Sequence, residues 1–253
     1  MQKSRKLLVG VTVGVLAVGV TAALAGPVIY RDFIAAPPVQ APTLSADQSV
    51  LGAAKEPAVA PSTGGTDSAT SGSVLDAAAL AGEWQVADGS EAGYRVDEVL
   101  NGTEITVTGR TNQVTGTFAI ADTGLTLDSA ELTVDVASII TDNDSRDNYF
   151  RSQALRTSEF PTATFTLTDP VTLESAPLAG DIVSTEAKGE LTIAGKSQPV
   201  TAQIELRSDG TTAEIAGSIP ITFADFGVEA PRLGFVSVAP TGAVEFQLTA
   251  AKP

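Results

Sequence analysis

The chain has 253 residues, and 15 Lys and Arg stand against 30 Asp and Glu, so its net charge at neutral pH is −15. It contains no histidine and no cysteine. These absences exclude Ser-His-Asp and Cys-His catalysis, zinc, blue-copper and iron–sulfur sites, and disulfides. The acidic balance argues against nucleic-acid binding, which needs clustered Lys and Arg. Three classes of function remain possible: catalysis by carboxylates, a site for a hard metal ion, or ligand binding without catalysis.

The chain begins with a basic cluster followed by an uncharged run. Residues 1–6 contain three basic side chains, and residues 7–30 carry no charge. As a helix, the uncharged run would span about 36 Å, enough to cross a membrane. The positive-inside rule predicts a cytoplasmic tip at 1–6, a single-pass transmembrane anchor at 7–30 and a C-terminal domain outside the cytoplasm. A signal peptide cleaved after Ala25 is the alternative, because Ala23-Leu24-Ala25 resembles a cleavage site.

Residues 31–79 are predicted to form a disordered linker. The segment is rich in Pro, Ala, Gly and Ser, and from residue 35 onward it contains no aromatic side chain that could support a core. About 45 flexible residues span roughly 35–40 Å, which would keep the following domain near the membrane. A simple spacer is an equally good interpretation.

Residues 80–253 show the alternation of apolar and polar side chains that is typical of half-buried strands. Short connections favour antiparallel order, and closure into a barrel would remove exposed edges. We therefore expect an all-β, eight-stranded, antiparallel barrel. The alternating segments are Tyr94–Val96, Ile105–Val107, Phe118–Ile120, Ala130–Val136, Ala163–Leu167, Ala187–Ile193, Val200–Leu206, Ile215–Phe223 and Val244–Leu248. Hairpin turns are expected at 101–102, 122–124, 208–210 and 240–242.

One polar segment, residues 142–155, interrupts the strand pattern and predicts a short helix across one end of the sheet. Asp144 is expected to cap its N-terminus, with Asp147 near the exposed amides. Asp147 and Arg151 stand one helical turn apart and could pair.

The acidic residues of this segment do not form a calcium-binding loop. Arg146 occupies the third ligand position, Asp147 replaces the required glycine and Gln153 replaces the bidentate glutamate. No metal site is therefore expected. Arg146, Arg151 and Arg156 could hold an anionic headgroup or gate the barrel, although pairing with the neighbouring aspartates is the default interpretation.

The inward side chains leave open whether the barrel is filled or hollow. An eight-stranded barrel is wide enough for a solid core or for one small ligand. Small inward residues, including Gly189 and Gly217, favour free space. The candidate apolar lining consists of Tyr94, Val96, Phe118, Leu132, Val134, Phe150, Phe165, Leu167, Phe223 and Phe246.

Four ordered motifs within residues 80–251 together resemble the YceI family. They are Gly82-Glu83-Trp84-Gln85-Val86; Arg146-Asp147 with Leu155 and Phe160-Pro161-Thr162-Ala163-Thr164-Phe165; Gly189-Glu190-Leu191-Thr192-Ile193-Ala194-Gly195 with Pro199-Val200; and Gly217-Ser218-Ile219-Pro220-Ile221 with Asp225-Phe226-Gly227. The resemblance implies an exported, lipocalin-like barrel that holds an isoprenoid chain in an apolar tunnel. Family members often carry a histidine after the Arg-Asp pair, where this chain has none, so a headgroup contact through imidazole cannot be carried over.

The sequence thus leads to three functional hypotheses. The first is a membrane-tethered, extracytoplasmic barrel that binds an isoprenoid or similar lipid, with no catalytic residue and no cofactor. The second is a solid-core surface domain that the anchor displays to a protein partner. The third is a carboxylate enzyme acting on envelope sugars, which would need two carboxylates facing each other across a cleft.

Overall fold

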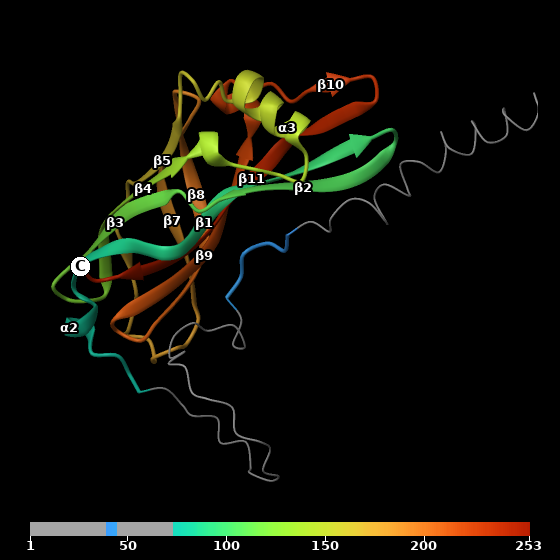
Figure 1. The fold of residues 1–253 in the computed structure, drawn as a ribbon. Helices are drawn as coiled ribbons and strands as arrows, with labels where there is room; N and C mark the ends of the chain where they lie inside the picture. The colour runs from blue at the N-terminus through green and yellow to red at the C-terminus, as the bar shows by residue number, and fades with distance from the viewer. Residues whose placement is uncertain (1–38, 45–72) are drawn as a thin grey trace, which may run out of the picture.

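The computed structural model describes residues 39–44 and 73–253, and Figure 1 shows that the second range forms a β-barrel with short helices at its ends. The helical elements are α2 (Ala77–Leu80), η3 (Val136–Ser138), α3 (Asp144–Tyr149), η4 (Phe150–Ala154) and η5 (Phe223–Phe226). The strands are β1 (Gly82–Leu100), β2 (Thr103–Thr111), β3 (Val114–Ile120), β4 (Thr126–Asp135), β5 (Thr162–Leu167), β6 (Val171–Thr172), β7 (Val183–Ile193), β8 (Lys196–Ser208), β9 (Thr212–Thr222), β10 (Arg232–Leu233) and β11 (Val236–Ala251).

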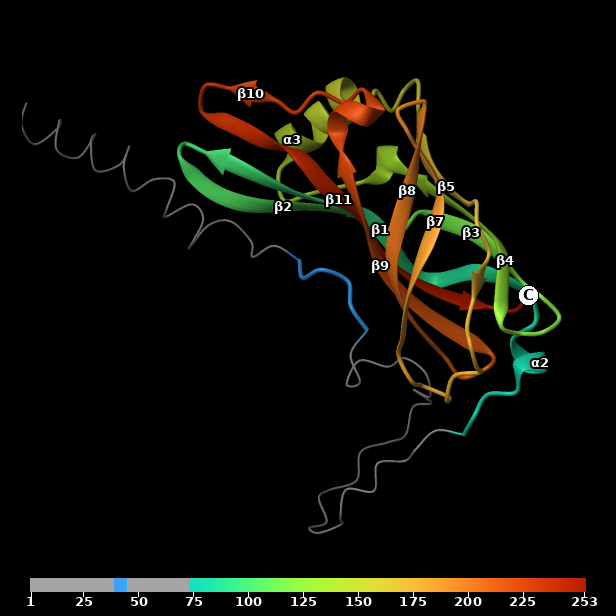
Figure 2. The ribbon, with the colours of Figure 1, turned by 180° about the vertical axis from the view of Figure 1, so that it is seen from behind.

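Eight of these strands close into a ring, all with antiparallel neighbours. The order is β1-β3-β4-β5-β7-β8-β9-β11, and β11 pairs again with β1. Strand β2 continues the sheet beyond β1, β10 pairs with β11, and β6 pairs with β4. The view from behind in Figure 2 shows the same wall of strands with α2 at one end and α3 at the other. The predicted eight-stranded antiparallel barrel with a short helix is confirmed.

The connections agree with the expected turns at three positions and differ at the fourth. The turns at 101–102, 122–124 and 208–210 link β1 to β2, β3 to β4 and β8 to β9. The turn predicted at 240–242 is wrong, because these residues lie inside β11. Val96 is paired with Gly242 and Glu98 with Val238, so residues 239–241 bulge opposite a single residue of β1. A bulge tolerates Pro240, which has no N–H for the ladder.

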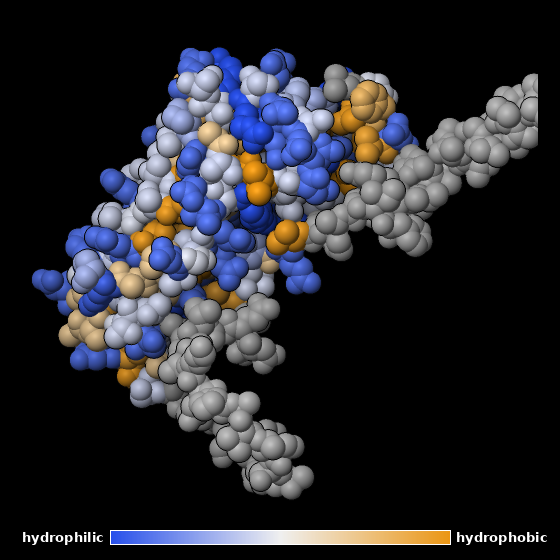
Figure 3. Space-filling model, in the orientation of Figure 1, coloured by the Kyte–Doolittle hydropathy of each residue, from blue (hydrophilic) through white to orange (hydrophobic). Residues whose placement is uncertain are grey.

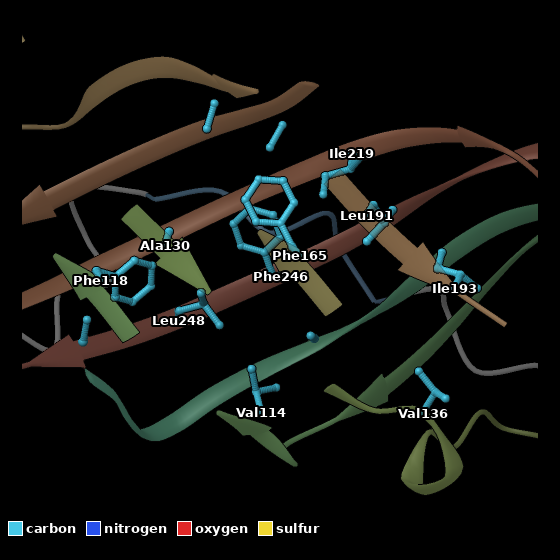
Figure 4. Close-up of a cluster of buried hydrophobic side chains, with 14 of the residues drawn as sticks. Val114, Phe118, Ala130, Val136, Phe165, Leu191, Ile193, Ile219, Phe246 and Leu248 are labelled. Carbon is cyan, nitrogen blue, oxygen red and sulfur yellow. The ribbon is translucent and has the colours of Figure 1, made fainter. Parts of the chain in front are cut away.

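Glycines inside the barrel are covered by aromatic rings from neighbouring strands. A Cβ atom on Gly217 would lie 2.5 Å from the Phe246 ring, and one on Gly189 would lie 2.3 Å from the Phe165 ring. Both phenylalanines belong to the buried cluster drawn in Figure 4. The expectation that these two glycines leave free space is therefore wrong, because each makes room for a ring.

The predicted helical segment is present, but Asn143 caps it instead of Asp144. Asn143 has an extended backbone, and its side chain accepts hydrogen bonds from the amides of Ser145 and Arg146 at 2.9 and 3.1 Å. Asp144 is already the first helical residue, so its side chain lies beyond the capping position.

Asp147 faces inward and does not pair with Arg151. The residue is 4% exposed, and its carboxylate accepts hydrogen bonds from the Thr141 amide at 3.0 Å and the Thr141 hydroxyl at 2.7 Å. Arg151 instead donates to the Ile139 carbonyl and the Asn148 side chain. The hydrogen bonds of Asp147 connect α3 to Thr141 in the loop that precedes it.

Two parts of the segment expected to be linker contact the barrel. Leu44 is buried, and its amide donates to Glu205 at 2.9 Å, while Arg95 donates to the Val39 carbonyl at 2.6 Å. Leu75 is also buried, and its amide donates to the Pro177 carbonyl. Within the described ranges, no helix has the length and apolar character needed to span a membrane. The predicted anchor at 7–30 and the alternative cleavage site lie outside the described residues.

Candidate ligand-binding site

The barrel encloses an inner chamber of about 210 Å³ with an almost entirely apolar wall. Trp84 belongs to this wall, is 2% exposed and donates from its ring nitrogen to the Leu80 carbonyl at 2.8 Å. Side chains of β3, β4, β5 and β11 supply much of the remaining surface. Of the predicted lining, this chamber contains Phe118, Leu132, Val134, Phe165, Leu167 and Phe246.

An outer chamber of about 490 Å³ lies between the barrel mouth and the α3–η4 segment. The rings of Tyr94 and Phe150 stack here with centroids 5.0 Å apart and an angle of 14° between their planes. A Cβ atom on Gly109 would lie 2.4 Å from the Tyr94 ring, so this glycine on β2 lets the tyrosine lie flat against the sheet. Val96 and Phe223 complete the predicted part of the lining.

The two chambers share a narrow set of small apolar residues. Four side chains line both chambers, and we call this ring the waist: Ala92, Val134, Ala163 and Val244. Ala163 is only half-buried although it faces the interior, because the cavity lies in front of it. The chambers therefore adjoin within one interior, and two of the four waist residues that separate them are alanines with small side chains.

Polar groups gather at one side of the outer chamber. The Arg146 guanidinium lies 2.6 Å from an Asp142 carboxylate oxygen and 3.6 Å from the Glu98 carboxylate, and Glu98 is buried. Burial raises the pKa of Tyr94 far above its ordinary value, and the nearby carboxylates raise it further against the opposing effect of Arg146. The Tyr94 hydroxyl therefore keeps its proton at neutral pH and can donate a hydrogen bond.

The three arginines considered as a headgroup site do not come together. Only Arg146 lines a chamber, and two carboxylates already accompany it. Arg156 pairs with Glu159 at 3.5 Å and lies over the Phe160 ring, while Arg151 binds the loop before α3. Each arginine therefore has its own partners, and for Arg146 these include Asp142, in line with the default interpretation of pairing with a neighbouring aspartate.

All ten residues predicted to line a cavity line one chamber or the other, and their contact with a ligand stays a prediction. The sequence analysis missed Trp84 and Ala92, because the alternation in β1 is evident only from Tyr94 onward. It also missed Glu98, because a charged side chain does not fit the apolar pattern of an inner face. Among the described residues, no group of three acidic side chains is arranged to hold a metal ion.

Curated bacterial proteins are similar in sequence to part of this chain. A UPF0312 protein of Pseudomonas aeruginosa is 30% identical over 128 residues, which are 48% of this chain and 63% of the relative. The YceI protein of Escherichia coli is 32% identical over 96 residues, 38% of this chain and 46% of that protein. The chain thus spans less than two thirds of the length of these curated relatives.

A solved structure shares the fold. It is described as a polyisoprenoid binding domain from Saccharophagus degradans implicated in plant cell wall breakdown. At 20% identity it superposes with a TM-score of 0.54 and covers 67% of this chain and 98% of that one. A family model for the YceI-like domain matches residues 84–250, which cover the closed ring except for the first two residues of β1 and the last residue of β11. The chain therefore belongs to the YceI family.

Proposed function

We propose that this protein binds a long apolar chain of the isoprenoid class inside the barrel and performs no catalysis. The observation that carries the proposal is the pair of adjoining chambers, one almost wholly apolar and one with polar groups at one side. The Saccharophagus degradans domain, which is described as polyisoprenoid binding, supports the same ligand class through its shared fold.

The chambers favour a particular orientation of such a ligand. Its tail would pass the waist into the inner chamber, where each buried CH₂ contributes about 0.8 kcal/mol. Its polar end would remain in the outer chamber near the Tyr94 hydroxyl and Arg146. An anionic headgroup there would also meet the Glu98 and Asp142 carboxylates, so Arg146 is a poor clamp for it.

The location that we propose follows from the sequence. The uncharged run at 7–30 would anchor the protein in the membrane, and the preceding basic tip would hold the barrel outside the cytoplasm, in the cell envelope. Membrane anchoring supports the carrier function, because membranes are where long-chain isoprenoids dissolve.

Native mass spectrometry of the full chain, extracted from its own host membranes in mild detergent, tests the function. We expect a bound species of several hundred daltons that is released into organic solvent with a polyprenyl fragment pattern. A clean apo mass, unchanged after incubation with quinones and polyprenyl phosphates, would contradict the proposal. That result would favour the alternative of a solid-core surface domain that contacts a protein partner. The volume of the outer chamber argues against a solid core.

A further inference from the structure

Two hairpin ends meet at one tip of the molecule. The β1–β2 turn lies at Asn101 and Gly102, and the β10–β11 turn contains Gly234 and Phe235. The Asn101 amide donates to the Phe235 carbonyl at 2.7 Å, so the two turns are joined. Figures 1 and 2 show both hairpins extending past the closed barrel on the side of α3. We call residues 99–103 and 233–238 the tip.

The tip is apolar and carries no charged side chain. Phe235 is 60% exposed and Val99 is 38% exposed. Figure 3 shows hydrophobic surface at the ends of these hairpins, bordered by polar surface. Single exposed apolar residues are ordinary on protein surfaces, but a continuous apolar patch with a polar border is typical of an interaction site.

The outer chamber reaches the surface at this tip. Leu100, Phe235 and Val236 line the chamber and belong to the two hairpin ends. Because Phe235 is both a lining residue and largely exposed, the apolar wall of the chamber continues onto the outer surface. A ligand that enters at the tip would contact apolar side chains on its way from the outer surface into the outer chamber.

The chain before the barrel restricts how far this tip can lie from a membrane. The Val39 carbonyl accepts a hydrogen bond from Arg95 on β1. Only eight residues separate Val39 from Tyr30, the end of the uncharged run, and the nine steps between them span at most about 30 Å. Arg95 precedes Leu100 by five residues of strand, or about 17 Å. If the run at 7–30 lies in a bilayer, the contact at Val39 holds the tip within reach of its surface.

We infer that the tip docks on the lipid bilayer and that the outer chamber takes up its ligand there. This inference rests on the proposed function. Phe235 and Val99 would enter the headgroup region, where apolar side chains gain free energy by leaving water. The protein is strongly acidic, so attraction to anionic lipids cannot supply the affinity, and apolar insertion next to the anchor must supply it.

Depth-dependent quenching of a fluorophore on the full chain tests the inference. The protein has no cysteine, so a single Gly234→Cys substitution can carry an environment-sensitive label. A Cβ atom at Gly234 meets nothing within 4 Å, so the substitution is tolerated. Thr123→Cys, in the β3–β4 turn at the opposite end of β1, provides the matched control. The protein is reconstituted into phosphatidylcholine vesicles containing nitroxide-labelled lipid.

We expect the label at position 234 to be quenched by the nitroxide lipid and the label at 123 to stay unquenched. Adding Phe235→Asp should abolish quenching at 234, whereas Ile182→Asp, at another exposed apolar position, should leave it unchanged. Equal quenching at both labels, or none at 234, would overturn the inference. Trp84 fluorescence, measured in detergent with an isoprenoid quinone, reports ligand binding separately. Intact Trp84 quenching with no quenching at 234 would overturn the docking and retain the proposed function.

Discussion

Closing the waist should separate the two chambers without unfolding the barrel. Ala163 lines both chambers and is half-buried against the cavity, so a larger side chain there enters open space instead of packed atoms. An Ala163→Phe substitution would place an aromatic ring at the waist, between the inner and outer chambers. We expect it to prevent a long tail from reaching the inner chamber while leaving the outer chamber accessible.

The loss of affinity can be worked out from the inner chamber. An unfilled apolar cavity costs about 24 cal/mol per Å³, so filling the 210 Å³ chamber corresponds to about 5 kcal/mol. Since each tenfold change in Kd is about 1.4 kcal/mol, a tail that fills the chamber should bind roughly three to four orders of magnitude more weakly to the variant. A short-tailed ligand that occupies only the outer chamber should bind both proteins equally.

Titration with isoprenoid quinones of increasing tail length measures both effects, with Trp84 fluorescence reporting occupancy of the inner chamber. Thr166→Phe, which adds the same ring at an exposed position of β5, is the matched control and should bind like the wild type. Equal long-tail affinity in the Ala163→Phe protein and the wild type would refute the reasoning that the tail passes the waist.

Three further predictions concern stability. Gly217→Ala places a Cβ atom 2.5 Å from the Phe246 ring and should lower the free energy of unfolding by about 1–3 kcal/mol, whereas Gly234→Ala, with free space around it, should have little effect in urea titrations. Asp147→Ala removes both hydrogen bonds that fasten α3 and should destabilise the protein by about 1–3 kcal/mol; an unchanged melting curve would contradict the role of this carboxylate. Burial raises the pKa of Tyr94, so above about pH 10 the unfolded chain loses a proton that the folded chain keeps, and stability falls as pH rises. Tyr94→Phe should therefore reduce the loss of stability between about pH 9 and pH 11, and parallel pH profiles for the two proteins would be evidence against this origin.

Strand alternation was a reliable guide to the barrel, since a period of two assigns each side chain to the inner or outer face. It assigned nine of the ten predicted lining residues to the inner face, including Tyr94, Phe165 and Phe246, whereas Phe150 belongs to the helical segment. It failed at Pro240, because a bulge and a turn use the same residue types. Asn143 was missed as the helix cap because Asp and Asn are nearly equal in that role, and the backbone geometry decides between neighbours.

The amino-acid sequence by itself determined the family, the antiparallel barrel and the absence of any chemistry that needs imidazole or thiol, because these follow from local pattern and composition. Only the tertiary structure decided where free volume lies. Gly217 looked like empty space in the sequence, yet the Phe246 ring covers it, while Ala163 borders a real cavity. Packing of side chains from strands far apart in sequence sets those volumes, so residue size at one position cannot reveal them.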